Sequence, residues 1–147
     1  MSTKMVNGVW VKGTLPEGVE VQRCDVYLDE RGWLIEWLDE NKGGPLNIRS
    51  VYTSVAYPGQ VRGAHYHLSR TEYWMVIGGE AEVALVDARP GSQGQQCTLC
   101  MGDVNPVRLT IPPGVAHQFR ALGTREARLL CCATETYNPA DNVPYDF

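Results

Sequence analysis

The sequence predicts an all-β protein. The segments between its turn residues are short and rich in Val, Ile, Tyr, Trp and Thr, which is typical of a sandwich or barrel of antiparallel strands. No helical periodicity is long enough to cover the face of a sheet. Pro and Gly mark the expected turns at residues 13–16, 43–45, 58–59, 78–79, 90–91 and 112–114.

The expected elements follow in chain order. Residues 6–12 form a first β-rich segment. Residues 80–86 alternate apolar and polar side chains, as a strand with one buried face does. The polar stretch 92–96 is expected to be a loop, and the strand over residues 107–111 ends at a proline pair. Residues 138–147 are expected to form an ordered tail or a short terminal strand.

Length and charge limit the classes of function. A chain of 147 residues with 44% hydrophobic residues fits one globular domain, residues 1–147. Thirteen Lys and Arg against 17 Asp and Glu give a net charge of −4 with no basic run, so nucleic-acid binding is not expected. No apolar run is long enough for a membrane span, and the N-terminus lacks the apolar core of a signal peptide. We therefore expect a cytoplasmic protein.

The five cysteines are an odd number in a chain without an evident export signal, which favours reduced thiols over a disulfide framework. Cys97 and Cys100 form a CxxC pair, and Cys131 and Cys132 are adjacent. A zinc or redox site would need a second such pair or a helix-opening context, and neither is present. These thiols are therefore expected to be buried or loop residues without a catalytic role.

All three histidines and one glutamate fall in a single pattern. His65 and His67 are two residues apart, so their side chains point to the same face of a strand. Glu72 follows a short connection and can begin the neighbouring strand. His117 follows the turn at residues 112–114 and re-enters a strand. A lone histidine is more often structural than functional, but these four side chains together predict a site for one divalent transition metal, namely Fe, Mn, Ni, Cu or Zn.

These spacings resemble the two sequence motifs of the cupin superfamily. The first motif fits without a gap from Gly59 to Gly79, with His65, His67 and Glu72 inside it. The second motif resembles the family less closely, because the segment 102–112 is longer than the family's short form. The resemblance implies a single-domain jelly-roll β-barrel with a metal site in its interior.

A second resemblance covers more of the chain. Four blocks, in the same order across residues 25–137, resemble dTDP-4-dehydrorhamnose 3,5-epimerases; they are residues 29–36, 59–66, 86–89 and 111–119. The resemblance implies a homodimeric cupin that acts on nucleotide-linked 4-keto-6-deoxy sugars. In this comparison His65 matches the catalytic base. Arg31, Glu36 and Arg62 match residues that line the pocket or contact the nucleotide diphosphate, and Tyr137 matches a second pocket tyrosine.

The chain departs from the epimerase pattern at three site positions. The family's active-site lysine falls at Glu72, its catalytic tyrosine at Cys131, and the glutamine that follows its His-Tyr pair at His67. The C-terminal segment that supplies an aspartate to orient the base is expected to be largely missing. Because Glu72 and His67 are the residues that complete a metal site, we expect a metal-assisted reaction.

The predicted function is isomerisation or epimerisation of a sugar or nucleotide sugar in carbohydrate biosynthesis. Removing a proton beside a ketone needs a base and stabilisation of the enolate oxygen, and a metal can supply the stabilisation. Since a metal-bound histidine cannot accept the proton, the base would be Tyr66, Tyr137, Glu36 or a metal-bound hydroxide. Arg31 and Arg62 carry guanidinium groups suited to phosphate, or else form surface ion pairs.

Two other functions and the oligomeric state stay open at this stage. The same ligand set would also serve a mononuclear iron dioxygenase, and a cupin can be a non-catalytic ligand-binding protein. A homodimer is expected from the resemblance, with residues 6–12 adding to a partner's sheet edge. The alternative for this segment is an edge strand of its own chain.

Overall fold

The structure, a computed structural model, describes residues 1–43 and 46–147. Strands make up most of it, and its only helices in the described parts are two short 3-10 turns, η1 (Glu40–Lys42) and η2 (Pro139–Asp141). None of the described helices is long and apolar enough to cross a bilayer. The predicted turn at residues 43–45 falls partly outside the described residues. The all-β prediction is confirmed.

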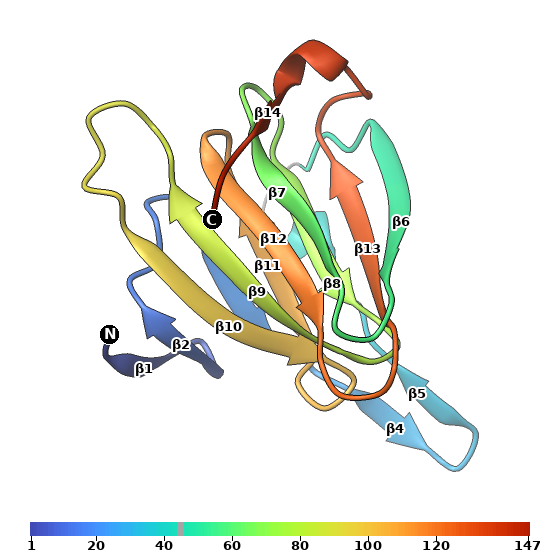
Figure 1. Ribbon diagram of the computed structural model, residues 1–147. Helices are drawn as coiled ribbons and strands as arrows, with labels where there is room; N and C mark the ends of the chain where they lie inside the picture. The colour runs from blue at the N-terminus through green and yellow to red at the C-terminus, as the bar shows by residue number, and fades with distance from the viewer. Residues whose placement is uncertain (44–45) are drawn as a thin grey trace.

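Two antiparallel sheets pack face to face (Figure 1). A small hairpin, β4 (Tyr27–Asp29) and β5 (Gly32–Leu34), projects from one end. The seven-stranded sheet has the order β1 (Thr3–Val6), β2 (Val9–Gly13), β10 (Gln96–Gly102), β9 (Glu80–Asp87), β12 (Val115–Ala121), β7 (Val61–His67) and β14 (Asn142–Pro144). The five-stranded sheet has the order β3 (Glu20–Arg23), β11 (Val107–Ile111), β8 (Glu72–Val76), β13 (Ala127–Ala133) and β6 (Ser50–Ala56).

The core lies between the two sheets. In β9 every second residue is buried, as the alternating sequence predicts. One continuous apolar cluster runs through both sheets, which gives the polar site described below a rigid surrounding. Its largest fully buried apolar side chains are Leu85, Met101, Leu109, Ile111 and Leu129.

The N-terminal and C-terminal segments both pair within the chain. Strand β1 pairs with β2, and β2 pairs with β10, so the structure favours the alternative of an intramolecular edge for residues 6–12. In the tail, η2 is followed by β14, which pairs with β7. The expected short terminal strand is therefore confirmed, and it lies directly beside the strand that carries His65 and His67.

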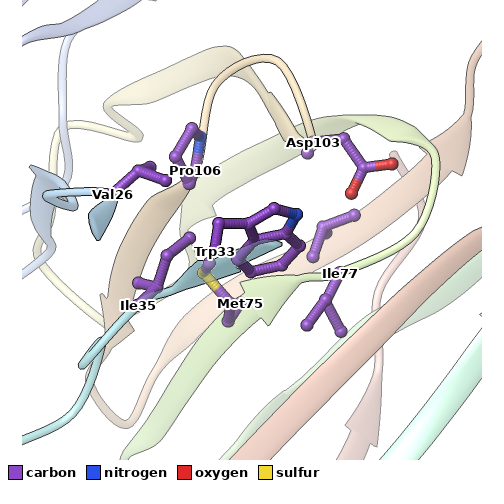
Figure 2. Close-up of a pocket in the computed structure, with 9 residues that line it drawn as sticks. Val26, Trp33, Ile35, Met75, Ile77, Asp103 and Pro106 are labelled. Carbon is purple, nitrogen blue, oxygen red and sulfur yellow. The ribbon is translucent and has the colours of Figure 1, made fainter. Parts of the chain in front are cut away.

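A cavity of about 90 Å³ lies on the outer face of the five-stranded sheet (Figure 2). Trp33 and Ile35 cover Met75 and Ile77 there, which explains why Met75 is buried although it points away from the core. None of the three histidines lines this cavity. It is therefore separate from the predicted metal site.

A β-bulge in β7 sets the direction of the site residues. His65 is opposite His117 and Gly63 is opposite Gln118, so Ala64 is an extra residue without a partner across the ladder. Gly63 has φ +97° and Ala64 φ +63°. A Cβ on Gly63 would lie 2.8 Å from the carbonyl oxygen of His117, so the close approach of the two strands requires glycine here.

The bulge places Arg62 and His65 on one face of the strand. Three residues apart, they would point to opposite faces of a regular strand. Arg62 is opposite the buried Phe119 and His65 is opposite the buried His117, so both lie on the face of the strand that is turned toward the other sheet, although Arg62 itself is exposed. The bulge therefore brings a guanidinium to the same side as the histidines.

Replacing Gly63 should test this geometry. Gly63→Ala puts a Cβ on left-handed backbone and against His117, whereas Gly59→Ala meets the same backbone problem at φ +76° with no atom within 4 Å. Left-handed backbone should cost each variant about 1 kcal/mol. Crowding should cost Gly63→Ala about 1–3 kcal/mol more. Urea unfolding measures both, and equal losses in the two variants would contradict the bulge argument.

Candidate functional site

Three imidazoles meet between the sheets. His65 and His67 lie two residues apart on β7, and His117 on the neighbouring strand β12 is the direct cross-strand partner of His65. One ring nitrogen from each of the three lies within 4.8 Å of the other two. His67 and His117 are buried, and His65 is half-buried. The structure therefore brings together all three predicted histidine ligands.

Glu72 faces the histidines from the opposite sheet. It begins β8 as predicted, but β8 pairs with β11 and β13 and not with β7. Its carboxylate, 1% exposed, lies 3.0 Å from Nε2 of His67 and 3.6 Å from Nε2 of His117. The fourth predicted ligand therefore reaches the cluster across the core.

Hydrogen-bond donors surround the Glu72 carboxylate. The Trp74 indole donates to Oε2 at 2.8 Å, and the Tyr52 hydroxyl donates to Oε1 at 3.1 Å. The buried Arg70 guanidinium donates to Oε1 at 3.3 Å. Burial alone raises the pKa of this carboxyl, but the contacts with His67 and Trp74 outweigh burial and leave the pKa below its ordinary value. Glu72 is thus an ionised carboxylate buried in the protein interior.

Two of the three histidines, His65 and His117, have lowered pKa values and are neutral at neutral pH. Burial lowers the pKa of His117 to about 4. Burial, followed by the neighbouring His67, also lowers the pKa of His65. A neutral imidazole offers a lone pair, which both metal binding and proton abstraction require.

Several ring nitrogens in the cluster make no hydrogen bond with the described residues. They are Nδ1 and Nε2 of His67 and Nε2 of His117, all buried. His117 Nδ1 lies 2.9 Å from the Val115 carbonyl, so this nitrogen carries the proton and Nε2 presents its lone pair to Glu72. Buried polar atoms are normally paired, so partnerless nitrogens beside a carboxylate fit a bound cation.

Sequence reasoning missed Tyr52. Tyr52 on β6 is the cross-strand partner of Cys131, the position where the resemblance places a catalytic tyrosine. Its hydroxyl reaches Glu72, and burial followed by the charge of Glu72 raises the pKa of this hydroxyl. The phenol therefore enters the site from the neighbouring strand, and only the β6–β13 pairing could have revealed it.

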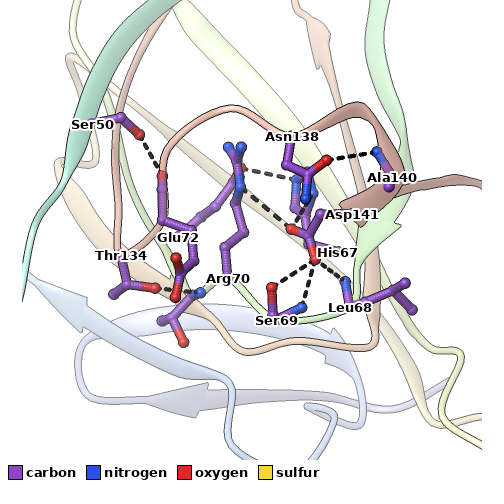
Figure 3. Close-up of polar contacts among 12 residues, drawn as sticks. Ser50, His67, Leu68, Ser69, Arg70, Glu72, Thr134, Asn138, Ala140 and Asp141 are labelled. Carbon is purple, nitrogen blue, oxygen red and sulfur yellow. Dashed lines mark hydrogen bonds and ion pairs between the residues drawn. The ribbon is translucent and has the colours of Figure 1, made fainter.

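Sequence reasoning also missed Asp141. The aspartate-bearing tail was expected to be largely missing, yet Asp141 in η2 is buried and its Oδ2 lies 3.6 Å from Nδ1 of His67 (Figure 3). Asp141 reaches this place because the short tail folds back along β7. Asp141 faces His67, whereas the resemblance expects its aspartate to orient the base, which is His65 here.

The other predicted site residues divide into two groups. Arg62 lies on the same face of β7 as the histidines but is exposed, and its Nε donates to the Ser54 hydroxyl at 2.8 Å. Within one chain the structure does not bring the rest to the cluster. Arg31 pairs with Asp29 in the projecting β4–β5 hairpin, at 83% side-chain exposure.

Glu36, Tyr66 and Tyr137 also lie apart from the cluster in a single chain. Glu36 is an exposed residue 3.7 Å from Lys42. Tyr66 lies between two inward-facing histidines on β7, so strand alternation points it to the opposite face. Tyr137 is 76% exposed. Within the described residues, the predicted base side chains therefore form no hydrogen bond with the histidine rings.

The cysteines form no disulfide and no metal cluster within the described residues. Cys97 is buried in the core and Cys100 is exposed, because residues three apart in β10 face opposite sides. Cys131 is buried beside Glu72, and burial followed by that charge raises the pKa of its thiol. A thiol held protonated in this way is a poor nucleophile.

Comparison with known proteins identifies the family. Residues 27–145 match the family described as the polysaccharide biosynthesis C-terminal domain. The chain belongs to this family. It is 32% identical over 136 residues to the spore coat polysaccharide biosynthesis protein SpsL of Bacillus subtilis, covering 88% of this chain and 90% of SpsL.

The chain is also similar to sugar epimerases. The chain is 30% identical over 124 residues to the dTDP-4-dehydrorhamnose 3,5-epimerase of Mycobacterium tuberculosis, covering 78% of this chain and 61% of that protein. ChmJ, a 3'-monoepimerase from Streptomyces bikiniensis solved with dTDP-quinovose, superposes with a TM-score of 0.81 at 25% identity, over 87% of this chain and 69% of ChmJ. The predicted jelly-roll fold and the resemblance to the epimerases are confirmed.

In this polysaccharide biosynthesis domain, stability should depend on pH through His117. The unfolded chain binds a proton at His117 near pH 6.5, but the folded chain binds it only near pH 4. Between these pH values the unfolded state binds more protons than the folded state. The free energy of unfolding should therefore keep its full value above pH 6.5 and fall by about 3 kcal/mol as the pH drops from 6.5 to 4.

Urea unfolding of chelator-treated protein across this pH range measures the effect. His117→Asn is the matched variant, because its amide can still donate to the Val115 carbonyl but takes up no proton. Its stability should fall less steeply between pH 6.5 and 4. Identical slopes for the two proteins would contradict the assignment.

Proposed function

We propose that this chain epimerises or isomerises a nucleotide-linked sugar in carbohydrate biosynthesis. We also propose that His65, His67, His117 and Glu72 hold one divalent transition metal ion there. The observation that carries the proposal is the convergence of these side chains, with the buried Nε2 atoms of His67 and His117 free of hydrogen bonds to described residues. The relation to sugar epimerases supports the substrate class.

The residue types fit such an ion. Two or three imidazoles with a carboxylate are a common ligand set for Fe, Mn, Ni, Cu and Zn. When bound, the ion would stabilise negative charge on the oxygen of an enolate. The epimerase pattern has a lysine at position 72 and a glutamine at position 67, and neither residue would be a comparable metal ligand.

We propose Tyr52 as the proton donor of the reaction, a role separate from that of the base for which Tyr66, Tyr137 and Glu36 are the predicted side chains. The Tyr52 hydroxyl is held at Glu72, and its raised pKa keeps it protonated at neutral pH. Arg62 supports binding of the diphosphate, because it is exposed on the face of β7 that carries the histidines and only its Nε is bonded to a described side chain. A guanidinium with free N–H groups suits phosphate oxygens.

The metal proposal predicts about one transition-metal ion per chain. Elemental analysis of protein purified without chelator, and again after reconstitution with Zn²⁺ or Fe²⁺, measures the stoichiometry. His67→Gln removes one imidazole and restores the residue of the epimerase pattern, so it should weaken binding at least tenfold. A wild-type protein that takes up none of the five metals under neutral reducing conditions would contradict the proposal.

The catalytic proposal predicts solvent deuterium exchange at one carbon of dTDP-4-keto-6-deoxyglucose, followed by NMR in D₂O. Exchange should stop when the metal is removed, and 3,5-epimerisation should be weak or absent. Tyr52→Phe should slow exchange about 100-fold or more, whereas Tyr57→Phe, which changes an exposed tyrosine, should not.

Other outcomes would point elsewhere. Exchange at both C3 and C5 that survives chelation would contradict the metal-assisted reaction. Oxygen consumption without exchange would favour a dioxygenase, and tight binding without exchange would favour a non-catalytic binding protein.

We further propose that the chain is a homodimer in the cytoplasm. Large apolar side chains are exposed on the β1–β2 and β4–β5 hairpins, including Met5, Trp10, Leu28 and Trp33. Five free cysteines fit a reducing compartment. Light scattering should give twice the chain mass of 16.3 kDa, and a monomer at micromolar concentration would contradict the dimer.

A further inference from the structure

The carboxylate of Asp141 lies behind His67, on the side away from the cluster. Its Oδ2 is 3.6 Å from Nδ1 of His67, while Nε2 of the same ring faces Glu72 at 3.0 Å (Figure 3). Asp141 is 6% exposed, so the contact is shielded from water. The imidazole ring therefore stands between two carboxylates, one on each nitrogen.

The turn between β7 and β8 holds Asp141 firmly. Its Oδ1 accepts hydrogen bonds from the backbone N–H of Leu68 at 3.0 Å, the backbone N–H of Ser69 at 2.7 Å and the Ser69 hydroxyl at 2.8 Å. The position of this oxygen is thus set by residues that directly follow His67. Pairing of Asn142 with His67 adds a second attachment of the tail to the same strand.

The second carboxylate oxygen of Asp141, Oδ2, has no hydrogen-bond donor among the described residues. Asp141 Oδ2 makes no hydrogen bond, and neither does Nδ1 of His67. The nearest cation is Arg70, whose Nε is 3.7 Å away. A buried acceptor and a buried ring nitrogen that face each other can satisfy each other after a small ring movement.

His117 in the same site shows how a hydrogen bond at Nδ1 can fix the tautomer of a histidine. Its Nδ1–H donates to the Val115 carbonyl, which directs the lone pair of Nε2 into the cluster. A metal-binding histidine usually donates its second N–H to a carbonyl or carboxylate, which fixes both tautomer and ring orientation. At Nδ1 of His67 the acceptor that faces the ring is Oδ2 of Asp141, 3.6 Å away.

We propose that Asp141 is the positioning residue of His67: it holds the proton on Nδ1 and so directs Nε2 toward the metal. The inference rests on the metal site of the proposed function. It makes the short C-terminal tail part of that site, although none of the tail's residues is a predicted ligand.

Asp141→Asn tests the proposal. The amide oxygen can keep the contacts of Oδ1 with the turn, while its NH₂ would face Nδ1 of His67 and favour a proton on Nε2 instead. Chelator competition should show Zn²⁺ binding weakened 10–100-fold. Ser69→Ala is the matched control, because it removes one bond to Oδ1 and leaves Oδ2 in place, so Zn²⁺ affinity should change less than about threefold while stability falls.

The tautomer gives a readout that does not need metal. In metal-free protein Glu72, 3.0 Å from Nε2, competes with Asp141 for the ring proton of His67. Two-bond ¹H–¹⁵N correlation spectra of metal-free protein should therefore show a larger fraction of His67 protonated on Nδ1 in the wild type than in Asp141→Asn, with His117 unchanged as an internal reference. An unaltered tautomer together with unaltered Zn²⁺ affinity would overturn the proposal. If the wild type binds no metal but the tautomer still switches, the metal site fails and the role of Asp141 at His67 survives.

Discussion

The burial of one carboxylate, that of Glu72, is the constraint on which the site depends. An isolated charge in an apolar interior is very costly, so each such group must be met by donors or a cation. Trp74 comes from the same strand, Tyr52 from β6 and Arg70 from the turn before β8. The histidines of the facing sheet complete the shell. Removing any one partner would leave a buried charge less compensated, which ties the packing of both sheets to the chemistry of this single residue.

Local spacing predicted most of the histidine cluster, because strand alternation places His65 and His67 on one face whatever the rest of the chain does. The sequence also indicated that Glu72 begins a strand. It could not indicate that this strand belongs to the opposite sheet, since pairing partners are set by long-range packing. The sequence did not predict the bulge at Gly63, although a glycine two residues before His65 is consistent with one. Tyr52 and Asp141 carried none, because one depends on the β6–β13 register and the other on the path of the tail.

The departures from the epimerase pattern form one physical change. Glu72 stands where that pattern has a lysine, and His67 stands where it has a glutamine, so a cation-bearing pocket becomes an anionic, imidazole-rich one suited to binding a cation. The loss of a tyrosine at Cys131 is matched by Tyr52, whose hydroxyl reaches the same carboxylate from the adjacent strand. The fold is therefore shared with the epimerases, while the charged and phenolic side chains between the sheets differ.

Anomalous X-ray diffraction from crystals of the Zn²⁺-loaded protein, recorded on both sides of the zinc edge, tests the central claim most directly. The account predicts one strong peak between the sheets, about 2 Å from Nε2 of His67 and of His117. A peak only at the cysteines, or no peak among the three histidines in crystals soaked with excess Zn²⁺, would contradict it. In that case the three imidazoles would be held by Glu72 alone.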